Sequence, residues 1–208
     1  MTISRNISVM AQGASSSGIL AGGYGGLGAS VSPTTAGNVL FTADGSVWSS
    51  TQKIVRGTSV ATTSGTSIDF TSIPSWVKRI TIMLQGVSTS GTSVVQIQIG
   101  SGSITATGYS GGAVYTVNIT ATGGAVTQTT GFQVPGVSAV NTRHGLYTLT
   151  NISGNIWVAS GCGGFSDVAG SWQGGGSLTL SGVLDRVRLT TVNGTDTFDA
   201  GSVNILYE

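Results

Sequence analysis

Ser110 lies in a motif that can present a catalytic nucleophile. The segment Gly108-Tyr-Ser-Gly-Gly112 matches the tight strand-to-helix turn that exposes a serine to a histidine base. In that arrangement an acidic residue and then a histidine follow the serine, but no Asp or Glu lies between Ser110 and His144. Glycine and serine are also common turn residues. We therefore interpret the segment as a turn and not as a hydrolase site.

A cysteine and a histidine offer a second nucleophilic pair. Cys162 is the only cysteine and His144 the only histidine, and a thiol beside an imidazole can attack a substrate covalently. A lone buried cysteine and a surface histidine are common without such chemistry, so we favour that interpretation. These two residues also cannot complete a four-ligand zinc site within a chain. We expect no enzymatic activity and no cofactor.

Two further patterns are weighed as ligand sites. Gly23-Tyr-Gly-Gly-Leu-Gly28 matches a dinucleotide-binding glycine pattern, but no helix start follows it, which favours a flexible linker. Asp196 and Asp199 share an expected turn, where oxygen atoms could surround calcium. Two carboxylates are few, so we favour turn-forming roles, with calcium held between subunits as the open alternative. No metal site within a chain is predicted.

Aromatic residues are sparse, and four of them fall in or beside loop-like segments. They are Tyr109, Tyr115, Trp157 and Trp172. Rings on loops can stack on sugars or anchor a protein partner, so we treat these four as candidate receptor contacts. Packing in the core is the alternative for each of them.

Strand patterns occupy the chain from Lys53 to the C-terminus. Ile80, Ile82 and Leu84 alternate with more polar residues, which is typical of half-buried antiparallel strands. Similar runs cover residues 95–99, 115–119, 146–152, 156–159, 177–180, 187–192 and 202–207. Turn residues, including Asn193-Gly194, separate them. We predict an all-β, antiparallel β-sandwich or jelly-roll-like domain over residues 53–208.

The first 52 residues differ from this domain. Residues 1–36 are predicted to be an extended arm with a short helix, because apolar residues recur there at helical spacing before a Gly/Ser/Ala-rich run. The candidates for anchoring this arm to a partner are Ile3, Arg5, Ile7 and Met10. Residues 37–52 predict a β-hairpin around Asp44-Gly45, a dipeptide that suits a tight turn.

The composition restricts the class of function. Charged residues make up 7% of the chain where about 25% is usual, while 39% of residues are hydrophobic. The net charge of +1 gives little repulsion between copies, so we expect an oligomer. Scattered Lys and Arg residues argue against nucleic acid as a partner. No apolar run long enough for membrane insertion and no secretory signal are evident, so synthesis in the cytoplasm is expected.

Several segments resemble a known family. Ser72-Ile-Pro-Ser-Trp-Val-Lys-Arg79, within residues 66–87, and Phe198-Asp-Ala-Gly-Ser-Val-Asn-Ile-Leu-Tyr-Glu208, within residues 184–208, resemble the C-terminal domain of bacteriophage and prophage tail-fibre-like structural proteins. Residues 35–49 resemble the hairpin that precedes such domains. Residues 2–10 resemble their N-terminal leader, although Gly25-Gly-Leu-Gly28 replaces the more usual Gly-Gly-Thr-Gly.

The resemblance implies a virion component on the tail or particle surface. It implies a homotrimer that is anchored through its N-terminal arm to other virion proteins and displays the β-domain to a host-surface glycan or protein. The alternative is a head fibre, decoration or adaptor protein with a purely structural role. A glycan-cleaving enzyme is disfavoured, because such enzymes usually need paired carboxylates and the chain has 7 acidic residues.

Overall fold

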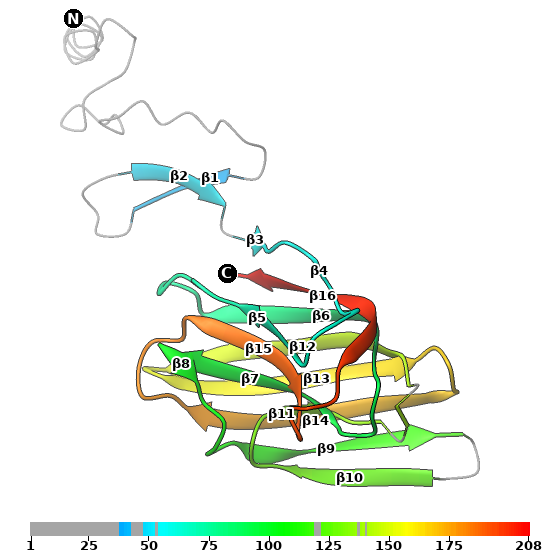
Figure 1. Ribbon diagram of the computed structural model, residues 1–208. Coiled ribbons are helices and arrows are strands. Elements are labelled where there is room, and N and C mark those ends of the chain that lie inside the picture. Colours follow the sequence, from blue (N-terminus) through cyan, green and yellow to red (C-terminus); the bar gives the residue numbers. More distant parts are fainter. Residues whose placement is uncertain (1–37, 43–47, 53, 119–121, 137, 140) are drawn as a thin grey trace, which may run out of the picture. The chain divides into compact units, whose positions relative to one another are not determined.

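The computed structural model describes residues 38–42, 48–52, 54–118, 122–136, 138–139 and 141–208 (Figure 1). Contacts divide the chain into two compact units, Met1–Ile54 and Val55–Glu208. The expected helix in residues 1–36 lies outside the described residues. Each unit is therefore described by itself.

The first unit contains a two-stranded antiparallel ladder. Strand β1 (Asn38–Thr42) pairs with β2 (Trp48–Gln52), and Thr42 lies opposite Trp48. The pairing confirms that the two runs around Asp44-Gly45 form a hairpin-like pair, while the turn itself lies outside the described residues.

The second unit is a β-sandwich-like fold of antiparallel strands, and its described residues contain no helix. Its strands are β3 (Val55–Arg56), β4 (Val60–Ala61), β5 (Ser67–Phe70), β6 (Arg79–Thr89), β7 (Val95–Ser101), β8 (Ser103–Ile104), β9 (Ser110–Val117), β10 (Thr122–Gln128), β11 (Phe132–Val134), β12 (Arg143–Ser153), β13 (Ile156–Phe165), β14 (Gly170–Thr179), β15 (Arg186–Thr191) and β16 (Phe198–Tyr207). The all-β, antiparallel prediction is thus confirmed for the described residues.

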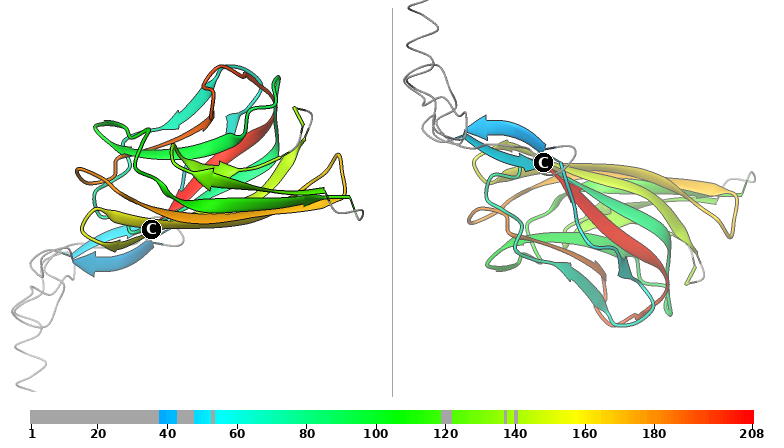
Figure 2. Two further views of the ribbon diagram at one scale, coloured as in Figure 1. Left: turned by 90° about the horizontal axis from the view of Figure 1, so that it is seen from below. Right: turned by 90° about the horizontal axis from the view of Figure 1, so that it is seen from above.

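Two sheets form the layers of the sandwich (Figure 2). The larger one, hereafter the large sheet, has nine strands in the order β10-β9-β14-β13-β12-β6-β16-β3, with β4 also paired to β16. The small sheet has five, in the order β11-β7-β15-β5, with β8 paired to β7. Within the part of the chain that the structure describes, there is no helix long and apolar enough to cross a membrane.

The core fills the space between the sheets. Ile82 and Leu149 point inward from the large sheet and Ile97 and Leu189 from the small sheet, and each of them is almost fully buried. Burying one such side chain stabilises the fold by about 1.5–3 kcal/mol. The alternation seen in the sequence therefore identified strands that do contribute one face to the core.

Glycine-rich segments lie inside strands β13 and β14, which extend beyond the runs 156–159 and 177–180 that were predicted from the sequence. Gly161 on β13 is paired with Tyr147 on β12, and a Cβ atom at Gly161 would overlap the tyrosine ring. Gly163 is likewise paired with Trp172 on β14, and a Cβ atom at Gly163 would overlap the tryptophan ring. The two rings stack with their centroids 6.1 Å apart and an interplanar angle of 13°. Glycine is needed because large rings lie flat against the neighbouring strand.

Strand β7 also departs from the expectation of one polar, solvated face. Its outward side chains Gln96 and Gln98 are only 2% and 6% exposed. Gln98 Nε2 donates to the backbone oxygen of Thr130 at 2.8 Å, and Thr130 Oγ1 donates to Gln96 Oε1 at 2.9 Å. The polar residues are buried because the segment around Thr130 covers them and supplies hydrogen-bond partners.

Candidate functional site

The candidate site is the outward surface of β12, β13, β14 and β9 in the large sheet, hereafter the outer face. Side chains alternate across a strand, so residues between the buried core positions point outward. The register places Leu146 opposite Cys162, Cys162 opposite Gln173, and Gln173 opposite Val114. These four residues form one continuous row across the strands.

A second row beside it consists of small residues. Thr148 lies opposite Ser160, Ser160 opposite Gly175, and Gly175 opposite Gly112. Because none of these side chains is large, the surface is low along this row. The outer face thus combines larger side chains in one row with small side chains in the next.

The two rows border an open trough of about 650 Å³. Leu146 stands on one side, with 52% of its surface exposed, and Val114 on the other, with 41% exposed. The remaining lining residues are Gly112, Ala113, Ala125, Val126, Thr148, Ser160, Gly161, Cys162, Gln173 and Gly174. Apart from the Cys162 thiol, this lining has no titratable side chain, so it suits contact with an uncharged surface.

The outer face also lacks charge as a whole. No Lys, Arg, Asp or Glu side chain points outward from the described residues of its strands between Ser110 and Val117, His144 and Ser153, Ile156 and Phe165, or Gly170 and Thr179. The nearest ion pair joins Arg79 to Glu208, at the end of β6. An exposed apolar surface without charge is typical of a contact surface.

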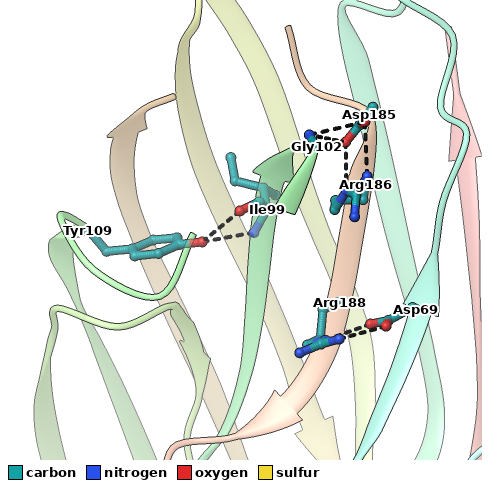
Figure 3. A network of polar contacts seen from close by, with 7 residues as sticks. All are labelled: Asp69, Ile99, Gly102, Tyr109, Asp185, Arg186 and Arg188. Carbon is teal, nitrogen blue, oxygen red and sulfur yellow. Dashed lines mark hydrogen bonds and ion pairs between the residues drawn. The ribbon is translucent and has the colours of Figure 1, made fainter. Parts of the chain in front are cut away.

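The small sheet presents a different surface (Figure 3). Arg188 on β15 donates two hydrogen bonds to the Asp69 carboxylate, of 2.6 and 2.7 Å. Arg186 makes a similar pair with Asp185, whose oxygens also accept the Gly102 amide. These hydrogen bonds, that from Arg186 foremost, hold the pKa of the Asp185 carboxyl below its ordinary value. Charged groups are thus paired on this side of the sandwich.

Cys162 and His144 lie on neighbouring strands as diagonal neighbours, and both ring nitrogens of His144 are hydrogen-bonded to other groups. Cys162 lies opposite Leu146, whereas His144 lies opposite Gly164. The Gly86 amide donates to His144 Nδ1 at 3.2 Å, and His144 Nε2 lies 3.1 Å from Ser166 Oγ. Because Nδ1 accepts a hydrogen bond, the neutral ring carries its proton on Nε2 and donates it to Ser166. In this tautomer His144 cannot take the proton of Ser166.

Arg143, next to His144, is a charged side chain that the sandwich buries. It is 2% exposed and donates from a guanidinium nitrogen to the backbone oxygen of Asn141 at 3.0 Å. Burial lowers the pKa of Arg143 to about 10, and attraction to Asp167 opposes this shift. The guanidinium belongs to the interior of the fold and does not contribute charge to the outer face.

Ser110 begins strand β9 and lies opposite Ser177 on β14. The interpretation of residues 108–112 as a turn is therefore wrong from Ser110 onward, because this serine already belongs to the sheet. Only Gly108, with a φ of 85°, has the backbone conformation of a turn that favours glycine. The strand-to-helix turn of a nucleophilic serine is not formed in this segment.

Asp196 supports a turn through hydrogen bonds, whereas Asp199 lies in a strand. The Asp196 carboxylate accepts the Ser93 amide at 2.9 Å and the Asn193 side-chain amide at 2.7 Å. Asp199 belongs to β16 and accepts the Ser88 hydroxyl of β6. The expected turn role therefore holds for Asp196, and the expectation that both residues share a turn is wrong for Asp199. Within the described residues, no group of three or more His, Cys, Asp or Glu side chains is placed to hold a metal ion.

The candidate receptor aromatics are core residues in the structure. Tyr109, Trp157 and Trp172 are 4%, 3% and 1% exposed, and Tyr115 is partly buried against the same core. The Tyr109 hydroxyl accepts the Ile99 amide at 2.8 Å (Figure 3). It also donates to the Thr105 oxygen at 2.9 Å. Burial raises the pKa of Tyr109. The packing alternative therefore describes these rings, because a buried ring face cannot stack on a sugar.

The anchoring candidates Ile3, Arg5, Ile7 and Met10 lie outside the described residues, as does the glycine pattern of residues 23–28. Sequence reasoning missed the outer face itself, whose exposed apolar residues include Ile152, Leu146 and Val114. The sequence pattern around Leu146 was ambiguous, because Leu146 and the adjacent Tyr147 are both apolar. Alternation alone could not show which of the two side chains points outward.

No family model, no curated protein and no solved structure matches this chain.

Proposed function

We propose that this protein is a non-enzymatic structural subunit of a bacteriophage particle, a fibre-like component that works as an oligomer. Its N-terminal arm would dock on other virion proteins, and its β-sandwich would be displayed on the tail or particle surface for host attachment. The resemblance of residues 66–87 and 184–208 to tail-fibre-like proteins is one support.

The observation that carries the proposal is the uncharged outer face of the large sheet. Leu146 and Val114 are exposed there beside a row of small residues. Water-soluble monomers seldom present a broad uncharged sheet surface, because such a surface promotes association. A subunit that functions within an assembly buries it. The low charge of the whole chain, 7% of residues, favours the same conclusion.

Attachment would depend on repeated weak contacts. An oligomer that holds several copies of the same β-sandwich raises the effective concentration of each binding surface, so avidity exceeds the affinity of one copy. No covalent bond needs to change in this process. The receptor would be a glycan or protein on the host surface.

Burial of the candidate aromatics favours one alternative, a head fibre, decoration or adaptor protein that contacts only virion proteins. Tyr109, Trp157 and Trp172 cannot reach a receptor from the core. Rings that stack on sugars are common in glycan recognition, so the burial of these candidate rings weakens the attachment role more than the structural one.

Cryo-electron microscopy of intact particles tests the proposal directly. Density for a projecting structure at the tail that accommodates several copies of the sandwich would support the fibre-like proposal. Density distributed over the capsid lattice would instead establish the decoration alternative, and absence of the protein from purified particles would refute both. Binding of the purified protein to host cells then separates attachment from a purely structural role.

A further inference from the structure

We infer that the outer face is the contact surface for a second copy of this chain, in which Leu146 of one copy enters the trough of the next. This inference rests on the proposed function, because both require the protein to act as an oligomer. It goes further by naming the surface, the partner and the residue that anchors the contact.

The first argument is area. From β9 to β12 the outer face contains four neighbouring strands spaced about 4.8 Å apart, and eight residues extend about 26 Å, so the face covers about 500 Å². A stable protein–protein interface buries about 800 Å² on each partner. The outer face therefore supplies more than half of the area that such an interface needs, and the adjacent strands β6 and β10 would supply the rest.

The second argument is charge. A partner rich in Lys and Arg, or in Asp and Glu, would need charges of opposite sign on this face, and none points outward from its described strands. A second copy brings an equally uncharged surface, so the contact produces no repulsion between like charges. A second copy of the chain therefore matches the uncharged outer face better than a strongly basic or strongly acidic partner does.

The third argument is shape. The same face carries a projecting side chain, Leu146, and a trough that begins directly beside it. A surface with both features can complement itself, because a symmetry-related copy presents its own Leu146 to the trough of the first. The small residues Gly112, Ser160 and Gly175 keep the trough open for that side chain.

Cys162 lies in this trough and provides a direct readout. It is exposed in the single copy, and the full chain contains no other cysteine. Reaction with a thiol reagent therefore reports on this face alone. In the assembled protein we expect slow labelling that accelerates on dilution, as the copies separate.

Two variants of the full chain test the contact. Leu146→Glu places a charge at the centre of the interface without disturbing the core, and we expect the dissociation constant to rise about 30-fold or more. Gly112→Leu adds an apolar side chain that fills the trough, and a Cβ atom at Gly112 meets only an ordinary contact, 3.5 Å from the Val126 oxygen. Non-specific adhesion would be strengthened by Gly112→Leu, whereas a contact between Leu146 and the trough would be weakened.

Val183→Glu is the matched control, because Val183 is 55% exposed, similar to Leu146, but lies outside the trough lining. Mass measured by light scattering and the rate of Cys162 labelling are recorded for all chains, and circular dichroism verifies folding. The inference is supported if the wild type and the Val183→Glu control are oligomeric and their Cys162 is protected from the reagent. The Leu146→Glu and Gly112→Leu chains should instead be dissociated, with a reactive Cys162.

Two results would overturn the inference. One is a wild-type chain that stays monomeric at micromolar concentrations with freely reactive Cys162. The other is an oligomer in which Cys162 reacts at the free rate and Leu146→Glu changes nothing, which would place the interface elsewhere and leave the proposed function intact. Failure of the proposed function is seen separately, as absence of the protein from phage particles.

Discussion

The two sheets of the sandwich present opposite kinds of outward surface. The small sheet carries ion pairs, such as Asp69 with Arg188, and covers its glutamines with a segment that satisfies their amides. The large sheet carries Leu146, Val114 and a row of small uncharged residues. Both sheets bury one face in the same core. Their outward faces differ because charge suits contact with water, whereas an uncharged face suits contact with another protein.

This difference also extends beneath the surface. Under the outer face, the stacked rings of Tyr147 and Trp172 lie flat against glycines of neighbouring strands. The small sheet is supported mainly by aliphatic residues such as Ile97 and Leu189. The shape of the uncharged face therefore depends on a layer of rings. Three of the following predictions test this dependence, and the fourth tests the small sheet for comparison.

The largest effect is expected from removing a ring below the outer face. Trp172→Ala should lower the free energy of unfolding by about 3–5 kcal/mol, because a large buried side chain is replaced by a cavity. Urea denaturation followed by circular dichroism measures the change. Trp76→Ala is the control, since Trp76 is 48% exposed and should lose much less. Equal losses in the two variants would contradict the importance of the ring layer.

Alkaline pH should weaken the same layer. Burial raises the pKa of Tyr147 to about 12, from 10.0, although a hydrogen bond with Gln128 acts in the opposite direction. The neutral phenol is favoured in the folded state, so its contribution is complete below pH 10 and is lost as pH rises through about 12. The loss should reach about 2–3 kcal/mol. Urea denaturation of wild type and Tyr147→Phe at several pH values measures this. The wild type should lose that much more stability than the variant as pH rises, and equal losses would show that the phenol is not responsible.

A smaller loss is expected from adding one methyl group beneath the ring of Tyr147. Gly161→Ala should destabilise the fold by about 1–3 kcal/mol, because the new Cβ atom overlaps the ring and the backbone must shift. Gly112→Ala, on the outward side of β9, is the control and should be close to neutral. Thermal unfolding of the two variants provides the measurement. A neutral Gly161→Ala would show that the ring is free to move.

The smallest effect should come from the small sheet. Asp69→Asn removes the ion pair with Arg188, whose side chains are 39% and 34% exposed, and should cost at most about 1 kcal/mol because solvent screens the pair. It should leave the mass of the oligomer unchanged. Urea denaturation and light scattering on the same preparation test both expectations. Dissociation by Asp69→Asn would mean that the charged surface, too, lies in an interface.

Local structure could be predicted from the sequence, but the pairing of strands and the surface that results from it could not. Alternation at Ile80, Ile82 and Leu84 identified a strand, and Asn193-Gly194 identified a turn in which Gly194 has a φ of 68°. The glycine-rich segments misled, because the ring that requires Gly161 belongs to Tyr147 on another strand. Which strands become neighbours is a non-local property that no single-sequence pattern records.

The candidate site shows the same limit. Cys162 and His144 were considered together because both could react, yet they are not directly opposite each other and the ring nitrogens of His144 bond to Gly86 and Ser166. Leu146, Gln173 and Val114 have no reactive group and drew no attention in the sequence. Their significance depends on being adjacent across strands that are far apart along the chain, which only the order of the sheet determines.

Strands β3 and β4 have a mechanical consequence for a chain held at its N-terminal side. Each pairs with β16 through only two residue pairs, whereas β16 pairs with β6 along most of its length. A pulling force applied ahead of Val55 would therefore unzip these short strands first, because their hydrogen bonds break one after another. About 40 Å of chain would be released while the core stayed folded. Under the proposed anchoring through the N-terminal arm, these two strands would act as an extensible tether between the anchor and the folded core.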